Sequence, residues 1–198
     1  MQRLLLLVAV VGCGGDGSSG VDAPTIPFDG APIDVAIDTP TGAFAITSPT
    51  LVEGAAFDVA NTCDGANTSP QLDWIGVPAN TLSLAIVFTD KANGLIHSVI
   101  YDIPANLTGL PADVEKVFAP TDVVGAHQTR TLGGAGARGY FGPCPNPQDG
   151  PHTYEFALYA LDVAILPGAT MATTQAQAET IILQHDLATA LLTGTRDR

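Results

Sequence analysis

The chain has 198 residues, enough for one domain with a substantial hydrophobic core and too few for two ordinary domains. It carries 7 Lys and Arg against 20 Asp and Glu, a formal charge of -13, so its surface repels phosphate backbones and we expect no nucleic-acid partner. The 21 Gly, the 15 Pro and a charged fraction of only 14% favour a β-rich or loop-rich domain over a helical bundle.

The first residues are typical of a secretory signal. Met1-Gln2-Arg3 gives a short positive start, and an apolar run from Leu4 to Val11 follows. Val10-Val11-Gly12-Cys13 resembles the bacterial lipobox, which implies cleavage before Cys13 and a lipid on its sulfur. A plain signal peptide followed by a chance Cys is the alternative. We therefore expect residues 1–12 to be a lipoprotein signal peptide, and the protein to be anchored in the bacterial cell envelope, facing the periplasm or the exterior.

Residues 13–42 have the composition of a tether. They are rich in Gly, Ser, Pro and Asp and contain no Lys or Arg. Such a segment buries too little apolar surface to order itself, and its like charges extend it. We expect it to hold the remaining domain, residues 43–198, away from the membrane.

Five short apolar runs in residues 43–198 predict β-strands separated by turns. Pro residues lie between the runs, as the hydrogen bonding of a sheet requires. The run LSLAIVFT is almost continuously apolar and is typical of a strand buried on both faces. The five predicted strands are residues 43–47, 71–74, 82–89, 96–103 and 153–162. Residues 119–151 are predicted to be almost entirely loop. A loop of that length usually carries a function or is held in place by contacts with the rest of the domain.

The C-terminal region predicts a helix. Thr174 and Gln177 fit a capping box. Apolar residues follow at helical spacing as far as Leu192, and Gly194 would end the helix. His185 lies within this stripe and reads as a core residue, whereas His127 reads as a surface residue.

His97 and His152 are the more informative histidines, because each lies at the mouth of a predicted strand beside an irregular loop, a common location for a binding site. Spacing alone leaves open a zinc site formed by these two residues and Asp90. The segment from Gly134 to Gly139 matches G-x-G-x-x-G but has no strand–turn–helix around it, so a dinucleotide site is rejected. We expect no cofactor and no metal.

Cys63 and Cys144 are the two Cys that remain in the domain. In a secreted compartment such a pair favours a disulfide, which would stabilise the fold by roughly 2–4 kcal/mol. Two buried free thiols are the alternative.

Several motifs in order resemble the phosphatidylethanolamine-binding protein (PEBP) family, most closely its bacterial Raf-kinase-inhibitor-like branch. The resemblance covers about residues 44–192. The motifs are TCDGANTSPQLDW from Thr62, HSVIYDIPA from His97, GYFGPCP from Gly139, and PHTY from Pro151 continuing into LYALD.

The resemblance implies a mainly β fold: an antiparallel Greek-key β-sandwich with a few peripheral helices, including a C-terminal one. It also implies a small anion pocket that takes phosphate-like headgroups. The chain departs from the family pattern at Lys91, Ser98 and Thr153, which replace residues of three motifs. The implied ligand-binding residues are Asp90, His97, Gly142, Pro143, His152 and Tyr154.

The sequence thus predicts a lipid-anchored envelope domain that binds a small anionic or phosphorylated ligand, because imidazoles, a tyrosine hydroxyl and backbone N–H groups can donate to an oxyanion. The alternative is an interaction protein that docks on a partner kinase or protease through the 119–151 loop. A third hypothesis is an enzyme that uses Asp90 and a His as acid and base. We favour binding over catalysis and therefore expect no catalytic residues.

Overall fold

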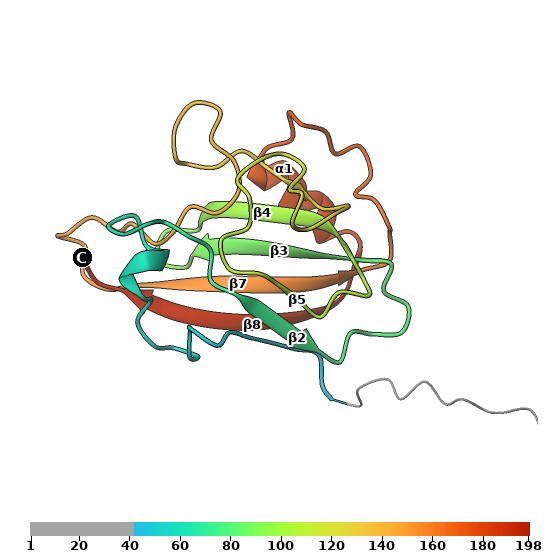
Figure 1. The fold of residues 1–198 in the computed structure, drawn as a ribbon, viewed down its shortest axis with the longest axis horizontal. Helices are drawn as coiled ribbons and strands as arrows, with labels where there is room; N and C mark the ends of the chain where they lie inside the picture. Colours follow the sequence, from blue (N-terminus) through green and yellow to red (C-terminus); the bar gives the residue numbers. More distant parts are fainter. Residues whose placement is uncertain (1–41) are drawn as a thin grey trace, which may run out of the picture. The chain divides into compact units, whose positions relative to one another are not determined.

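The computed structural model describes residues 42–198, and the expected signal peptide, the lipidation residue Cys13 and the tether as far as residue 41 lie outside the described residues. Two antiparallel sheets make up the fold (Figure 1). The smaller sheet has the order β1-β2-β5, from Ala45–Thr47, Leu72–Ile75 and Gly109–Leu110. The larger has the order β6-β4-β3-β7-β8. Its strands are His127–Gln128, Leu95–Pro104, Ser83–Asp90, His152–Leu161 and Asp186–Arg196.

The main core lies between the two sheets. The side chains of β3 are buried on both faces of the sheet, as its near-continuous apolar sequence predicts. Leu84, Ile86 and Phe88 face the main core, while Ala85 and Val87 face a second cluster on the other side of the sheet. The helix α1, Gln175–Ile182, covers that second cluster with Ala178 and Ile182. A short 3-10 helix, η1, spans Val59–Asn61. The mainly β, antiparallel sandwich that the family resemblance implied is confirmed.

The predicted C-terminal helix is wrong in its second half. The capping box of Thr174 and Gln177 is present, but α1 ends at Ile182, and β8 follows. The spacing of the apolar residues in this segment fits both a helix and a strand. The segment forms a strand because it pairs with β7 along its whole length. Gly194 is therefore no helix cap: a Cβ there would lie 2.5 Å from Cε2 of Phe57, so the glycine permits close packing across the strand. His185 follows the helix, partly exposed, and its Nδ1 lies 2.8 Å from Oδ1 of Asp162.

The long loop is tied down rather than free. Strand β6 pairs with β4, and Arg130 forms an isolated bridge with Arg138. His127 is no isolated surface residue, since its Nδ1 lies 2.8 Å from Oδ2 of the buried Asp102.

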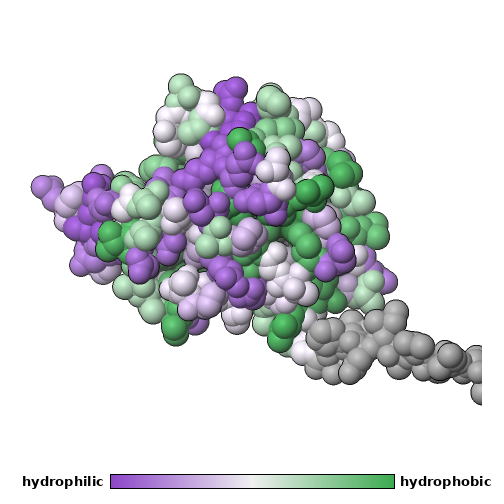
Figure 2. All heavy atoms as spheres, in the orientation of Figure 1, coloured by the Kyte–Doolittle hydropathy of each residue, from purple (hydrophilic) through white to green (hydrophobic). Residues whose placement is uncertain are grey.

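The face seen in Figure 2 gathers polar side chains across its middle, with smaller apolar groups between and beside them. Within the described residues, no helix is both long and apolar enough to cross a membrane.

Candidate functional site

One end of the larger sheet gathers the three residues on which the sequence argument depends. Asp90 ends β3, His97 lies near the start of β4, and His152 begins β7. Antiparallel pairing of β3 with both neighbours brings these positions to the same end of the sheet. All three line one pocket of about 210 Å³. The predicted convergence of a loop acid and two imidazoles on a shared cavity is therefore present.

The Asp90 carboxylate orients His152. Its Oδ2 lies 2.7 Å from Nδ1 of His152, and both side chains are largely buried. Asp90 also accepts hydrogen bonds from the backbone N–H of Ala92 at 2.9 Å and from Nδ2 of Asn93 at 3.3 Å. Because an ionised carboxylate only accepts, Nδ1 of His152 carries the proton, and Nε2 is the ring nitrogen left for a ligand.

The second imidazole is fixed in the same way by a backbone group. Nδ1 of His97 lies 3.0 Å from the carbonyl oxygen of Phe141, so Nδ1 donates and Nε2 is again left free. The ring packs against Phe88, Phe141 and Tyr154. Burial lowers the pKa of His97, and so favours the neutral ring near pH 7.

Tyr154 packs against the two imidazoles but is not among the residues that line the pocket. Its side chain is fully buried, and its hydroxyl makes no hydrogen bond of good geometry to the described residues. Burial, and then the neighbouring Asp90 carboxylate, raise the pKa of the Tyr154 hydroxyl above its usual range. The ring contacts both imidazoles, so Tyr154 fixes their spacing.

Gly142 and Pro143 brace the neighbouring loop and do not line the pocket. The Gly142 N–H donates to Oδ1 of Asn67 at 2.7 Å, so the N–H that the sequence offered to a ligand is already used. The Pro143 carbonyl accepts from the N–H of Cys63 at 3.2 Å. A Cβ on Gly142 would lie 2.1 Å from the carbonyl oxygen of Asn61, which explains the glycine by close packing.

Sequence reasoning missed most of the remaining pocket wall. Asp149 accepts a hydrogen bond from Nδ2 of Asn146 at 2.9 Å, and both residues line the pocket. Their signal was their place in the Gly/Pro-rich loop just before His152. The other lining residues that sequence reasoning missed are Asn93, Leu95, Leu132, Phe141, Cys144 and Pro145.

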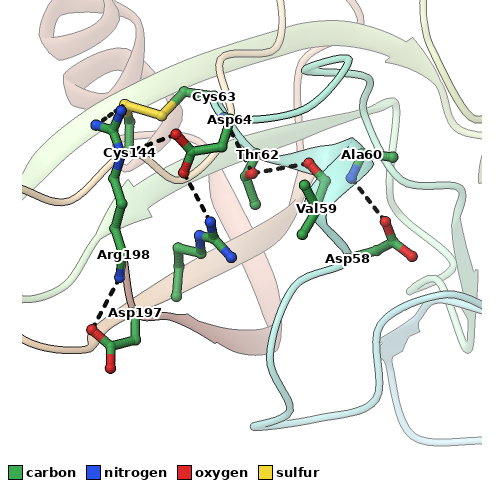
Figure 3. Close-up of polar contacts among 10 residues, drawn as sticks. Asp58, Val59, Ala60, Thr62, Cys63, Asp64, Cys144, Asp197 and Arg198 are labelled. Carbon is green, nitrogen blue, oxygen red and sulfur yellow. Dashed lines mark hydrogen bonds and ion pairs between the residues drawn. A yellow bond between two sulfur atoms is a disulfide. The ribbon is translucent and has the colours of Figure 1, made fainter. Parts of the chain in front are cut away.

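A disulfide closes the wall of the pocket. Cys63 and Cys144 are bonded, with Cα atoms 5.4 Å apart, and this settles the alternatives left open by the sequence in favour of the disulfide (Figure 3). Beside it, the Asp64 carboxylate accepts from Nη2 of Arg196 at 2.8 Å and contacts Nε of Arg198 at 3.0 Å. Chiefly through the hydrogen bond from Arg196, the pKa of Asp64 is lowered.

The zinc alternative finds no support in the geometry. Within residues 42–198, no three His, Cys, Asp or Glu side chains are grouped so that they could hold a metal ion.

Comparison with known proteins agrees with this architecture. The family described as phosphatidylethanolamine-binding protein matches residues 47–197. This chain belongs to the phosphatidylethanolamine-binding protein family. The resemblance indicated by the ordered motifs is thereby confirmed.

Individual similar proteins match most of the length of this chain. A Mycobacterium tuberculosis protein named "Putative lipoprotein LppC" is 35% identical over 198 residues, covering 97% of this chain and 92% of that protein. The crystal structure of Escherichia coli YbcL, described as a new member of the mammalian PEBP family, matches with a TM-score of 0.71 at 30% identity, covering 79% of this chain and 99% of YbcL. A Chlamydia trachomatis PEBP homologue, CT736, matches with a TM-score of 0.65 at 28% identity, covering 79% of this chain and 98% of CT736.

Proposed function

We propose that this PEBP-family protein binds a small anionic or phosphorylated ligand, of the phospholipid-headgroup kind, in the pocket formed by Asp90, His97 and His152. The observation that carries the proposal is the common orientation of the two imidazoles. Each has its Nδ1 tied to a protein acceptor, Asp90 for His152 and the Phe141 carbonyl for His97, which leaves both Nε2 atoms for one ligand.

Proton uptake accompanies the binding of an anion in this scheme. A neutral imidazole whose Nδ1 carries the proton has only a lone pair at Nε2. A phosphate oxygen therefore bonds to Nε2 either when the ring gains a proton or when the phosphate itself carries one. The Asp90 carboxylate lies 2.7 Å from Nδ1 of His152, so it faces any positive charge that the ring gains with the ligand. The pocket thus acts as a receptor that takes its anion together with a proton.

The same pocket has a place for a positive group. Asp149 and Asn146 present a carboxylate and an amide in its wall. An ammonium group on the ligand would face them while the phosphoryl group faces the imidazoles. This arrangement supports a zwitterionic headgroup such as phosphorylethanolamine over a ligand that carries only negative charge.

We further propose that a lipid on Cys13 anchors the protein in the cell envelope. The support is the lipobox-like sequence from Val10 to Cys13 and the name of the full-length LppC relative. Metabolic labelling with a fatty acid tests the anchor, since Cys13→Ser should abolish the label while Cys63→Ser leaves it.

The test of ligand binding is calorimetric titration of the full chain with phosphorylethanolamine, with the matched variants His152→Gln and His185→Gln. Both histidines bond an Asp through Nδ1, but only His152 lines the pocket. We expect His152→Gln to weaken binding about tenfold or more, and His185→Gln to leave it unchanged. Absence of binding at millimolar ligand, or an equal loss in both variants, would contradict the proposal.

Binding without turnover is part of the same proposal. Phosphorus NMR of phosphorylethanolamine incubated with the protein should show an intact phosphoester. Cleavage that disappears with His152→Gln would instead make the Asp90–His152 pair an acid–base catalyst.

A further inference from the structure

The pocket has little positive charge of its own. Its lining includes the carboxylates of Asp90 and Asp149, and no Lys or Arg from residues 42–198. His97, held neutral by its burial, adds no charge near pH 7. If the pocket takes an anion together with a proton, as proposed above, any further positive charge must come from beside this lining.

Two guanidinium groups lie beside the pocket wall. Arg196 is directly opposite His152 in the ladder of β7 and β8, so their side chains are neighbours on one face of the sheet. Its Nε is buried and has no hydrogen-bond partner among the described residues. Nη1 of Arg198 lies 3.5 Å from Sγ of Cys144. Since His152 and Cys144 both line the pocket, each of the two Arg side chains lies next to one residue of its lining.

A single carboxylate holds both groups. Asp64 contacts Nη2 of Arg196 at 2.8 Å. It also contacts Nε of Arg198 at 3.0 Å, and Figure 3 labels these two residues. The pair with Arg198 faces solvent, since 28% of the Asp64 side chain and 37% of the Arg198 side chain are exposed, whereas only 18% of the Arg196 side chain is exposed. Solvent-exposed ion pairs are worth little and are weakened by salt, so a phosphate group can compete with Asp64 for the same donors. Arg is well suited to such an exchange because its planar donor fork fits carboxylate and phosphate alike.

We propose that Arg196 and Arg198 form a phosphate-receiving rim of the pocket, and that Asp64 occupies this rim when no anion is bound. This inference rests on the proposed function and deepens it. The ligand class becomes a compact phosphate monoester, whose oxyanion bridges the rim and the Nε2 atoms of the two histidines. Asp64 then sets affinity by internal competition, without touching the ligand.

Opposite effects of two substitutions test the proposal. In titrations of the full chain in detergent at low salt, with inorganic phosphate and with phosphorylethanolamine, Arg198→Gln should weaken binding about tenfold. Asp64→Asn should tighten it about threefold, because it frees the rim.

The Lys91–Glu155 pair supplies matched controls. Nζ of Lys91 lies 2.8 Å from Oε1 of Glu155, so Lys91→Gln and Glu155→Gln change net charge by the same amounts as the two test variants. The proposal predicts that both controls bind like the wild type. Unchanged melting temperatures and an intact disulfide would show that each variant is folded.

The outcomes separate this inference from the function on which it rests. Opposite shifts in the test pair with silent controls support the rim. Shifts of equal size in test and control variants would mean a net-charge effect and overturn it. Binding by the wild type that no substitution changes would overturn the rim and leave the proposed function standing. Absence of binding by the wild type would overturn both.

Discussion

Oδ2 of Asp90 and Nδ1 of His152 lie 2.7 Å apart, although 62 positions separate the two residues in the chain. The pairing of β3 with β7 creates this contact: Asp90 is directly opposite Tyr154, two positions beyond His152. The Asp90 side chain therefore extends past Tyr154, along β7, to the imidazole ring of His152. The sheet register therefore determines which nitrogen of His152 faces the pocket.

Replacement of Asp90 by Asn should weaken phosphate binding about tenfold, because the amide oxygen can still accept from Nδ1 of His152 but places no negative charge beside the ring. The matched change Asp162→Asn removes the acid beside His185, outside the pocket, and should leave the affinity unchanged. Calorimetric titration of the three proteins checks this. Equal affinity of Asp90→Asn and the wild type would show that Asp90 acts only in the fold.

The stability of the domain should fall on acidification through the histidine range. Burial lowers the pKa of His97 in the folded state, so below the ordinary value of 6.5 the unfolded chain binds more protons at this residue than the folded one. The resulting loss begins near pH 6.5 and stops growing once the pH is below the folded-state pKa. Calorimetric melting of the wild type and of His97→Gln between pH 7.5 and 4.5 measures it. The variant should show a shallower decline, and parallel curves would contradict the assignment.

The long strands of the sandwich were predicted well because they carry their own signal, whereas the sandwich itself was implied by the family resemblance. The run from Ser83 to Asp90 is apolar on both faces, and the structure buries it between two clusters. The segment after Ile182 was misread because its apolar spacing also fits a helix. Only the ten-residue ladder with β7, a non-local contact, distinguishes the two.

The site shows the same division between local and non-local information. His97 and His152 were found because each lies at the mouth of an apolar strand beside an irregular loop, and Asp90 was implied by the family resemblance. The surroundings of Gly142 and Tyr154 could not be predicted, since they depend on residues distant in the chain. Gly142 donates a hydrogen bond to Asn67, and the Asp90 carboxylate raises the pKa of the Tyr154 hydroxyl.

Replacement of Gly194 by Ala should destabilise the protein by about 1–3 kcal/mol, since the new methyl group would overlap the ring of Phe57 and press on Leu51. The additional change Phe57→Leu should recover part of the loss by making room for the methyl group. Urea unfolding of the two single variants and the double variant gives the coupling energy. Strictly additive effects would show that the methyl group does not meet Phe57.

Loss of the disulfide should weaken both the fold and the pocket. Cys63 and Cys144 are 81 positions apart, and opening a loop of that size costs roughly 2–4 kcal/mol of stability. Because Cys144 lines the pocket and begins the segment that carries Asn146 and Asp149, the wall of the pocket also loses a covalent support. The Cys63→Ser/Cys144→Ser variant should unfold at lower urea concentration and bind phosphorylethanolamine more weakly than the wild type. Binding equal to the wild type, under conditions where the variant is folded, would show that the 144–149 wall is held by its other contacts alone.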